Sequence, residues 1–271
     1  MSDFLAEMSA ASWRRLERAR AALPQHALEQ RVAPLPAAPP LRLDRFDVIA
    51  EVKRRSPAAG PLGAADDDLA QRVTAYAAGG ACAVSVLTEP ERFQGALADL
   101  AAAARVLAPL SVPAMRKDFL VDPYQVLEAR AAGAGGVLLI IRMLSDAQLE
   151  SLLAAARELG LFALLEAFDA ADAARLTRLV DAHAHQQVLM AGLNCRDLGT
   201  LAVMPARLLR EFAHLPRAVP RVAESGVEHP AAARALAAAG YEMALVGGAL
   251  MRSANARQLT AELIAAGREA R

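Results

Sequence analysis

A lysine with charged neighbours follows a short apolar run near the middle of the chain. The run begins at Pro113 and leads into Arg116-Lys117-Asp118-Phe119. A neighbouring cation and apolar surroundings both favour the neutral amine, so Lys117 is a candidate for a lowered pKa and for proton transfer. An exposed Lys117–Asp118 ion pair is the structural alternative, and this stretch alone favours it. The other polar groups of the chain decide between the two interpretations.

Further groups that bind or move protons stand at the ends of other apolar runs. They are Glu51, Lys53, Ser56, Glu166, Asn194, Arg196, Glu224 and Ser225. Two lysines and three carboxylates gathered in one place would couple their titrations. Such a set can protonate a carbonyl oxygen and remove a proton elsewhere on the same substrate. A lysine that forms a Schiff base with a carbonyl is the competing role, and residue spacing does not separate the two.

The elements that must position these groups alternate regularly from residue 46 onward. Short apolar runs predict strands at 47–52, 82–87, 112–116, 136–141, 161–166, 187–192, 219–223 and 243–247. Alanine-rich stretches predict helices at 66–78, 95–107, 123–132, 146–159, 169–180, 205–213, 230–239 and 256–267. Asp122, Ser145, Asp169 and His229 are placed to cap the starts of four of these helices.

Eight such units in this length predict an α/β fold, a closed (β/α)8 TIM barrel with an N-terminal helical extension. An open doubly wound sheet is the alternative, but its glycine-rich turn is absent after the first strand, where the sequence reads KRRSPAAG. The polar groups named above would then converge at the carboxyl ends of the barrel strands, where the active sites of such barrels lie.

Two domains are expected. Residues 1–45 hold a helix over 3–22, ended by Pro24, and a proline-rich linker over 30–40 that excludes regular helix. Residues 46–271 form the barrel. The loop at 54–65 contains two prolines and several small residues and is a candidate lid.

Glycines at the last two strand ends indicate a phosphate site. Gly226, Gly247 and Gly248 can bring backbone N–H groups close to an anion, beside the starts of helices. Ser56 and Arg196 could add a hydroxyl group and a cation. Tight turns without a ligand are the structural alternative.

Composition excludes several classes of partner. The 271 residues carry 30 Lys+Arg and 30 Asp+Glu, so neither nucleic acid nor a membrane surface is an expected partner. Cys82 and Cys195 lack the spacing of metal ligands and indicate a reducing compartment. No signal-peptide pattern or membrane span is recognisable. We therefore expect a cytoplasmic protein, either a monomer or a weak homo-oligomer.

Several stretches resemble the indole-3-glycerol-phosphate synthase family. They are IAEVKRRSP at 49–57, SVLTE at 85–89, RKDFLVDPY at 116–124, LE at 165–166, GLNCRDL at 192–198, VAESGV at 222–227 and VGGALM at 246–251. The resemblance extends from about residue 46 to about residue 255 in the family's order. The string R-K-D-F-x-x-D-P-Y is its most specific part.

The resemblance implies a carboxy-lyase of tryptophan biosynthesis that closes the indole ring of 1-(2-carboxyphenylamino)-1-deoxyribulose 5-phosphate, with loss of CO2 and water. It implies that Lys117 is the general acid and that Glu166 acts as acid and base in the dehydration. Lys53 would hold the substrate carboxylate and share in proton transfer, and Glu51 would complete the catalytic set by positioning the lysines. Other implied contacts are Glu51, Asn194 and Glu224 for the sugar hydroxyls, Ser56, Arg196, Gly226, Gly247 and Gly248 for the phosphate, Ser225 as a lining residue, and Leu87, Phe93 and Phe119 as a wall for the aromatic ring. No metal or organic cofactor is implied.

The sequence departs from the family pattern at a few positions, which leaves room for weaker phosphate affinity or a specialised paralogue. They are Ala58, Arg92, Ala96, Cys195, Leu201 and Met204. Cys195 is interpreted as a small packed residue and not as a nucleophile.

Two other functions stay open. The related phosphoribosylanthranilate isomerase would require a catalytic cysteine near the end of the first strand, where Glu51 and Lys53 stand. A barrel that only binds a phosphorylated ligand would be favoured if Lys117 or Glu166 were missing, but both are present.

Overall fold

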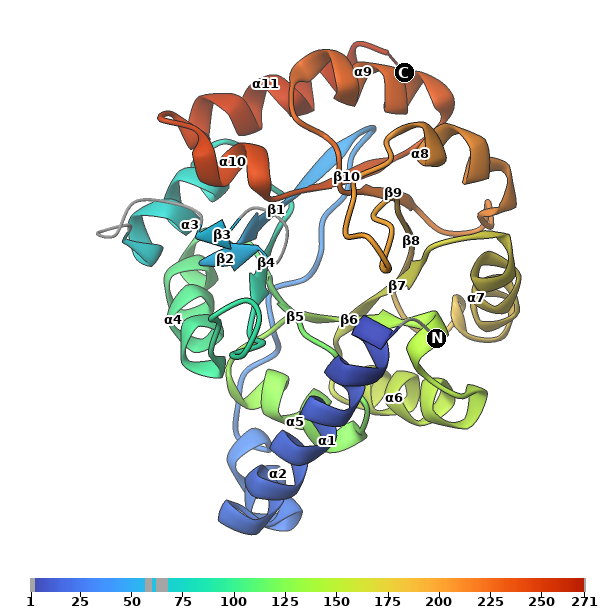
Figure 1. Cartoon of the computed structure of the whole chain (residues 1–271). Coiled ribbons are helices and arrows are strands. Elements are labelled where there is room, and N and C mark those ends of the chain that lie inside the picture. Colours follow the sequence, from blue (N-terminus) through green and yellow to red (C-terminus); the bar gives the residue numbers. More distant parts are fainter. Residues whose placement is uncertain (1–2, 57–59, 62–67, 271) are drawn as a thin grey trace.

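Eight parallel strands close into a barrel in the computed structural model, which describes residues 3–56, 60–61 and 68–270 (Figure 1). The barrel strands are β1 (Asp47–Val52), β4 (Ala83–Leu87), β5 (Ala114–Lys117), β6 (Gly136–Ile140), β7 (Phe162–Ala167), β8 (Leu189–Asn194), β9 (Arg221–Glu224) and β10 (Met243–Val246). Each strand pairs with its neighbour in sequence, and β10 closes the barrel on β1. The predicted TIM barrel is confirmed, and the open sheet is wrong.

A helix follows each barrel strand and covers the outside of the barrel (Figure 1). These helices are α3 (Leu69–Ala78), α4 (Leu97–Leu107), α5 (Pro123–Ala131), α6 (Asp146–Glu158), α7 (Ala170–His183), α8 (Ala206–Glu211), α9 (Pro230–Ala239) and α11 (Ala256–Arg268). The four predicted caps accept backbone N–H groups of the first turn, and Ser145 forms a capping box with Gln148. None of the helices described is both long and apolar enough to cross a membrane.

Further short elements lie among the barrel strands and helices. Helix α10 (Gly248–Arg252) follows β10 directly. Strands β2 (Arg55–Ser56) and β3 (Gly60–Pro61) form a separate antiparallel pair after β1. The proposed lid at 54–65 falls largely outside the described residues, as does Ala58.

Two predicted strands that contain a proline begin later in the structure than the sequence indicated. The strands expected at 112–116 and 219–223 begin after Pro113 and Pro220, at Ala114 and Arg221. A proline has no N–H to give to a strand ladder, which explains both differences. The barrel strands are buried almost throughout, because helices cover their outer faces and side chains fill the interior.

The N-terminal region contains one helix more than predicted. Helix α1 (Asp3–Ala22) agrees with the expected helix, but α2 (Gln25–Val32) occupies part of the stretch assigned to a linker. Pro24 ends α1 and then starts α2, because its fixed φ of −57° suits the beginning of a helix. Figure 1 shows α1 and α2 in blue beside α5, which both contact. The division into domains at residue 45 stays a prediction.

Candidate active site

A cavity of about 260 Å³ opens at the carboxyl ends of the barrel strands. Its lining contains these residues predicted from the sequence: Glu51, Lys53, Leu87, Phe93, Lys117, Phe119, Glu166, Asn194, Arg196, Glu224, Ser225, Gly226, Gly247 and Gly248. The backbone of Ser56 lies in β2, and its side chain is outside the part of the chain described. The barrel therefore brings together groups from β1, β5, β7, β8, β9 and β10.

Lys117 lies between two buried carboxylates at the centre of this cavity. Its Nζ is 3.5 Å from Oε2 of Glu224 and 3.7 Å from Oε1 of Glu166. Asn194 donates a hydrogen bond to Glu166, and its Oδ1 accepts the hydroxyl proton of Ser225 at 2.9 Å. Because four different strands supply these residues, the arrangement depends on barrel closure and not on sequence proximity.

The pKa of Lys117 is raised, so the lowered value expected from the sequence is wrong. Burial acts to lower this pKa, but the carboxylates of Glu166, Glu224 and Glu51 outweigh it and raise it above the usual range. Arg116 does not destabilise the ammonium group, since consecutive side chains of a strand point to opposite faces. Lys117 is therefore protonated at neutral pH and has a proton to donate.

Arg116 lies on the other side of β5, and it binds Asp118, which follows the strand and also contributes to the cavity lining. The Arg116 guanidinium donates to the backbone oxygen of Gln125 at 2.8 Å and to Asp118 at 3.2 Å. Burial acts to raise the pKa of Asp118, but Arg116 and Arg15 overcome it and hold that pKa below its ordinary value. The alternative of an exposed Lys117–Asp118 pair is thus also wrong.

Glu51 and Lys53 form a second ion pair at the end of β1. Burial alone would raise the pKa of Glu51, but Lys53 and Lys117 keep it below its usual value, so Glu51 is ionised. Gly247 lies against both side chains, and a Cβ at this position would collide with Oε1 of Glu51. Gly247 is therefore required as space for this ion pair, in addition to its predicted role near a phosphate.

Glu224 differs from the other carboxylates of the cavity. Burial and repulsion from Glu166 raise its pKa to about 8, although Lys117 acts in the opposite direction. Its Oε1 is buried without a hydrogen-bond partner among the described residues and lies against Gly192, where a Cβ would collide with it. Glu224 is thus largely protonated at neutral pH, which lets it share the cavity with Glu51 and Glu166.

Replacing Glu224 with glutamine is expected to flatten the dependence of the unfolding free energy on pH. Folded Glu224 keeps its proton up to about pH 8, whereas the unfolded side chain releases it near pH 4.5. The stability from this group is therefore complete below pH 4.5 and is lost as the pH rises through about 8. Urea unfolding at several pH values within that window measures the slope for both proteins.

The matched control is Glu269→Gln, because Glu269 pairs with Arg234 at the protein surface, away from the cavity lining. This variant is expected to keep the wild-type slope. Equal slopes for wild type and Glu224→Gln would contradict the assigned protonation of Glu224.

An apolar wall closes one side of the cavity. The ring centroids of Phe93 and Phe119 are 6.2 Å apart, and Leu87 lies beside them in the lining. Phe4 of α1 meets Phe119 edge to face at 6.0 Å and, with Leu5, also lines the cavity. Sequence reasoning missed these two N-terminal residues. Their helical spacing indicated an apolar face, but only the tertiary structure shows that it covers the barrel mouth.

The opposite side of the cavity is formed by backbone atoms and polar side chains. Ser225 and Gly226 have φ angles of 70° and 74°, so two consecutive residues adopt the left-handed conformation. The guanidinium of Arg196 is held by the backbone oxygen of Leu201 at 2.8 Å. Arg252 also lines this side and was not predicted. Backbone N–H groups and two guanidinium groups together form surroundings suited to an anion.

Cys195 is buried, and burial raises the pKa of its thiol. Its side chain contacts the backbone oxygen of Ser225, which agrees with the predicted packing role. Within the described part of the chain, no cluster of three or more His, Cys, Asp or Glu side chains is arranged to hold a metal ion.

Comparison with known proteins identifies the family. The model of the family "Indole-3-glycerol phosphate synthase" matches residues 9–263. Proteins of that name from Parafrankia sp. and Mycobacterium leprae are 44% identical over 245 residues and 45% identical over 235 residues. These alignments cover 89% and 87% of this chain and 87% and 82% of the relatives. A third, from Beutenbergia cavernae, is 46% identical over 226 residues, which are 83% of this chain and 80% of the relative.

Solved structures show the fold alone. A 3-hexulose-6-phosphate synthase from Salmonella typhimurium superimposes with a TM-score of 0.61 at 13% identity and covers 83% of this chain and 100% of that one. Thiamine phosphate pyrophosphorylase from Pyrococcus furiosus superimposes with a TM-score of 0.56 at 15% identity, over 83% and 97% of the two chains.

The match to the family model and to the synthases from Parafrankia, Mycobacterium leprae and Beutenbergia cavernae spans most of the chain. The protein belongs to the indole-3-glycerol phosphate synthase family.

Proposed function

We propose that this protein converts 1-(2-carboxyphenylamino)-1-deoxyribulose 5-phosphate to indole-3-glycerol phosphate, with loss of CO2 and water, in tryptophan biosynthesis. The observation that carries the proposal is the protonated Lys117 between Glu166 and Glu224. An aromatic wall lies on one side of this centre, and glycines and arginines lie on the other. The two sides are matched to the two ends of the substrate, a benzoate ring and a sugar phosphate.

Lys117 is the general acid of the first step. The ring carbon that bears the carboxylate attacks the carbonyl carbon of the sugar, and a carbon–carbon bond forms. The carbonyl oxygen takes a proton from the Lys117 ammonium and becomes a hydroxyl group. The carboxylate then leaves as CO2, and its bonding electron pair restores the aromatic ring. Lys53 is placed to hold that carboxylate before it leaves, while Glu51 positions Lys53.

Glu166 serves the second step, the dehydration. The new hydroxyl group takes up a proton and departs as water, and the neighbouring carbon loses a proton to form the double bond of the five-membered ring. Glu166 is buried beside Lys117 and accepts a hydrogen bond from Asn194, so it is held within reach of the same substrate oxygen. Protein acid–base groups are sufficient for both steps, and we propose no cofactor.

The remaining groups bind and orient the substrate. Phe93, Phe119 and Leu87 enclose the aromatic ring, and Gly226, Gly247, Gly248, Ser56 and Arg196 are assigned to the phosphate. Asn194, Glu224 and Ser225 face the sugar hydroxyls. We also propose that the protein is cytoplasmic and is a monomer or a weak homo-oligomer. Its proposed partner is the small-molecule substrate and not nucleic acid.

The test follows indole fluorescence after the purified protein is mixed with the carboxyphenylamino-ribulose phosphate. We expect a fluorescent product whose mass equals that of the substrate less CO2 and water. The control compound is the same substrate without its phosphate group, and the kcat/KM for this compound is expected to be at least tenfold lower. Phosphoribosylanthranilate is offered in parallel. Conversion of that compound without any indole product would support the related isomerase and overturn the proposal.

A further inference from the structure

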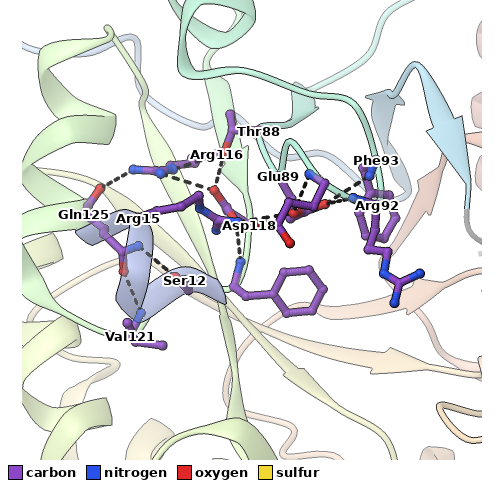
Figure 2. Close-up of polar contacts among 12 residues, drawn as sticks. Ser12, Arg15, Thr88, Glu89, Arg92, Phe93, Arg116, Asp118, Val121 and Gln125 are labelled. Carbon is purple, nitrogen blue, oxygen red and sulfur yellow. Dashed lines mark hydrogen bonds and ion pairs between the residues drawn. The ribbon is translucent and has the colours of Figure 1, made fainter. Parts of the chain in front are cut away.

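Arg15 of α1 joins two loops at the barrel mouth (Figure 2). Its Nη1 is 3.2 Å from Oε1 of Glu89, which follows β4, and its Nη2 is 2.6 Å from Oδ1 of Asp118, which follows β5. Both carboxylates are buried. One planar guanidinium therefore connects the extension to two neighbouring loops, with a fixed distance between the two contacts.

Glu89 organises the loop that carries Phe93. Its carboxylate accepts the backbone N–H groups of Glu91 at 2.8 Å, Arg92 at 2.7 Å and Phe93 at 3.0 Å, as Figure 2 shows for the last two. The backbone of Phe93 is thus directly tied to the carboxylate that Arg15 holds.

Asp118 organises the loop that carries Phe119. Its carboxylate accepts the Phe119 N–H at 2.8 Å and the Thr88 hydroxyl at 2.7 Å. Asp118 also follows Lys117 directly in the chain, so a shift of its backbone would move the lysine at the end of β5. The positions of Phe119 and Lys117 therefore both depend on how Asp118 is held.

Open space borders this region on its outer side. A cleft of about 330 Å³ lies there between α1, the end of β4 and α5, lined in part by Arg15, Thr88 and Asp118. Thr88, Glu89 and Asp118 are nevertheless buried, so packing and polar contacts hold them together. Thr88 and Arg116 also bind Asp118, and Arg15 adds a contact from α1 to each of the two loops.

Other contacts of α1 act on the loop after β5. Phe4 packs edge to face on Phe119, and Ser12 accepts a hydrogen bond from Gln125 at 2.8 Å. Gln125 in turn accepts the N–H of Val121 at 2.8 Å. Ser12 and Arg15 are three residues apart and lie on one face of the helix, which faces the active-site loops.

We propose that Arg15 is a positioning residue of the active site, which sets the spacing between Lys117 and the aromatic wall of Phe93 and Phe119. The proposal rests on the proposed function, since the wall is assigned to the substrate's aromatic ring. Arg15 is not among the described residues that line the cavity, so it acts through Glu89 and Asp118.

The test compares Arg15→Met with Arg20→Met. Arg20 lies on the same helix, pairs with Asp122 at 2.6 Å, and stacks on Tyr124, but these contacts lie outside the cavity lining. We expect Arg15→Met to lower kcat/KM by roughly tenfold to a hundredfold, because small misplacements of reacting groups cost about that much. Arg20→Met is expected to stay within about twofold of wild type, because its partly exposed ion pair contributes little.

Arg15→Lys separates geometry from charge. A lysine keeps the positive charge but lacks the rigid fork that spans two carboxylates. We expect it to restore thermal stability while keeping most of the loss in kcat/KM. Full recovery of kcat/KM by lysine would overturn the positioning role, since charge alone would then suffice.

Hydrogen exchange provides a measurement that does not depend on activity. Peptides that cover 89–95 and 117–121 are expected to exchange faster in Arg15→Met than in wild type, and unchanged in Arg20→Met. If wild type forms no indole product, the proposed function fails, while the exchange rates still test Arg15. If wild type is active and Arg15→Met matches Arg20→Met in kcat/KM and in exchange, the inference is wrong.

Discussion

Replacing Lys117 with methionine is expected to lower kcat by roughly 10²–10⁴-fold, because a positioned general acid contributes about that much. Methionine retains most of the length of the side chain but has no proton to donate. Without the ammonium, the substrate carbonyl oxygen would have to accept negative charge beside Glu166 and Glu224. Steady-state indole fluorescence with wild type and variant at equal concentration measures the change.

Lys117→Arg is the control variant that keeps the positive charge at this position. Arginine keeps a positive charge beside Glu166 and Glu224 but does not release its proton at accessible pH. We expect it to be nearly as inactive as Lys117→Met while it retains more of the thermal stability. A kcat within tenfold of wild type for either variant would remove Lys117 from the role of general acid.

Replacing Glu166 with glutamine is expected to block the dehydration, the step that follows ring closure and decarboxylation. Glutamine still accepts the hydrogen bond from Asn194, but it does not transfer protons. Ring closure and decarboxylation would proceed through Lys117, whereas dehydration would fall by roughly 10²–10⁴-fold. We therefore expect KM to change little and kcat to fall strongly.

The two variants differ in what a single turnover releases. Quenched samples of Glu166→Gln should contain CO2 and an intermediate that is heavier than the product by one molecule of water. Lys117→Met should release no CO2 in the same period. If Glu166→Gln also releases no CO2, then Glu166 acts before decarboxylation, and its assignment to the dehydration is incorrect.

Local patterns along the chain determined the architecture. Each strand and helix of the barrel carries its own signal, an apolar run or an alanine-rich stretch with a cap such as Asp122 or Ser145. Because parallel strands with intervening helices must align their carboxyl ends, the polar residues at those ends had to meet. The polar groups that the strand ends contribute to the cavity were therefore predictable before any distance was known. The exception was α2, where prolines on either side of a short helix concealed it.

The protonation states were decided by the tertiary structure alone. Arg116 precedes Lys117 in sequence, yet it points to the opposite face of β5, while Glu51, Glu166 and Glu224 arrive from three other strands. The sign of the shift in the Lys117 pKa follows from these distant carboxylates. Electrostatic energy depends on separation in space, and that separation exists only once the barrel has closed.

The sequence likewise did not predict where the N-terminal extension packs on the barrel. By itself the sequence determined a helix with an apolar face, a barrel with eight strand ends, and the groups that those ends present. Only the folded chain placed Phe4 against Phe119 and Arg15 between Glu89 and Asp118. A helix joined by a long connection can pack its apolar face on many surfaces. The fit between one guanidinium and two buried carboxylates selects among them.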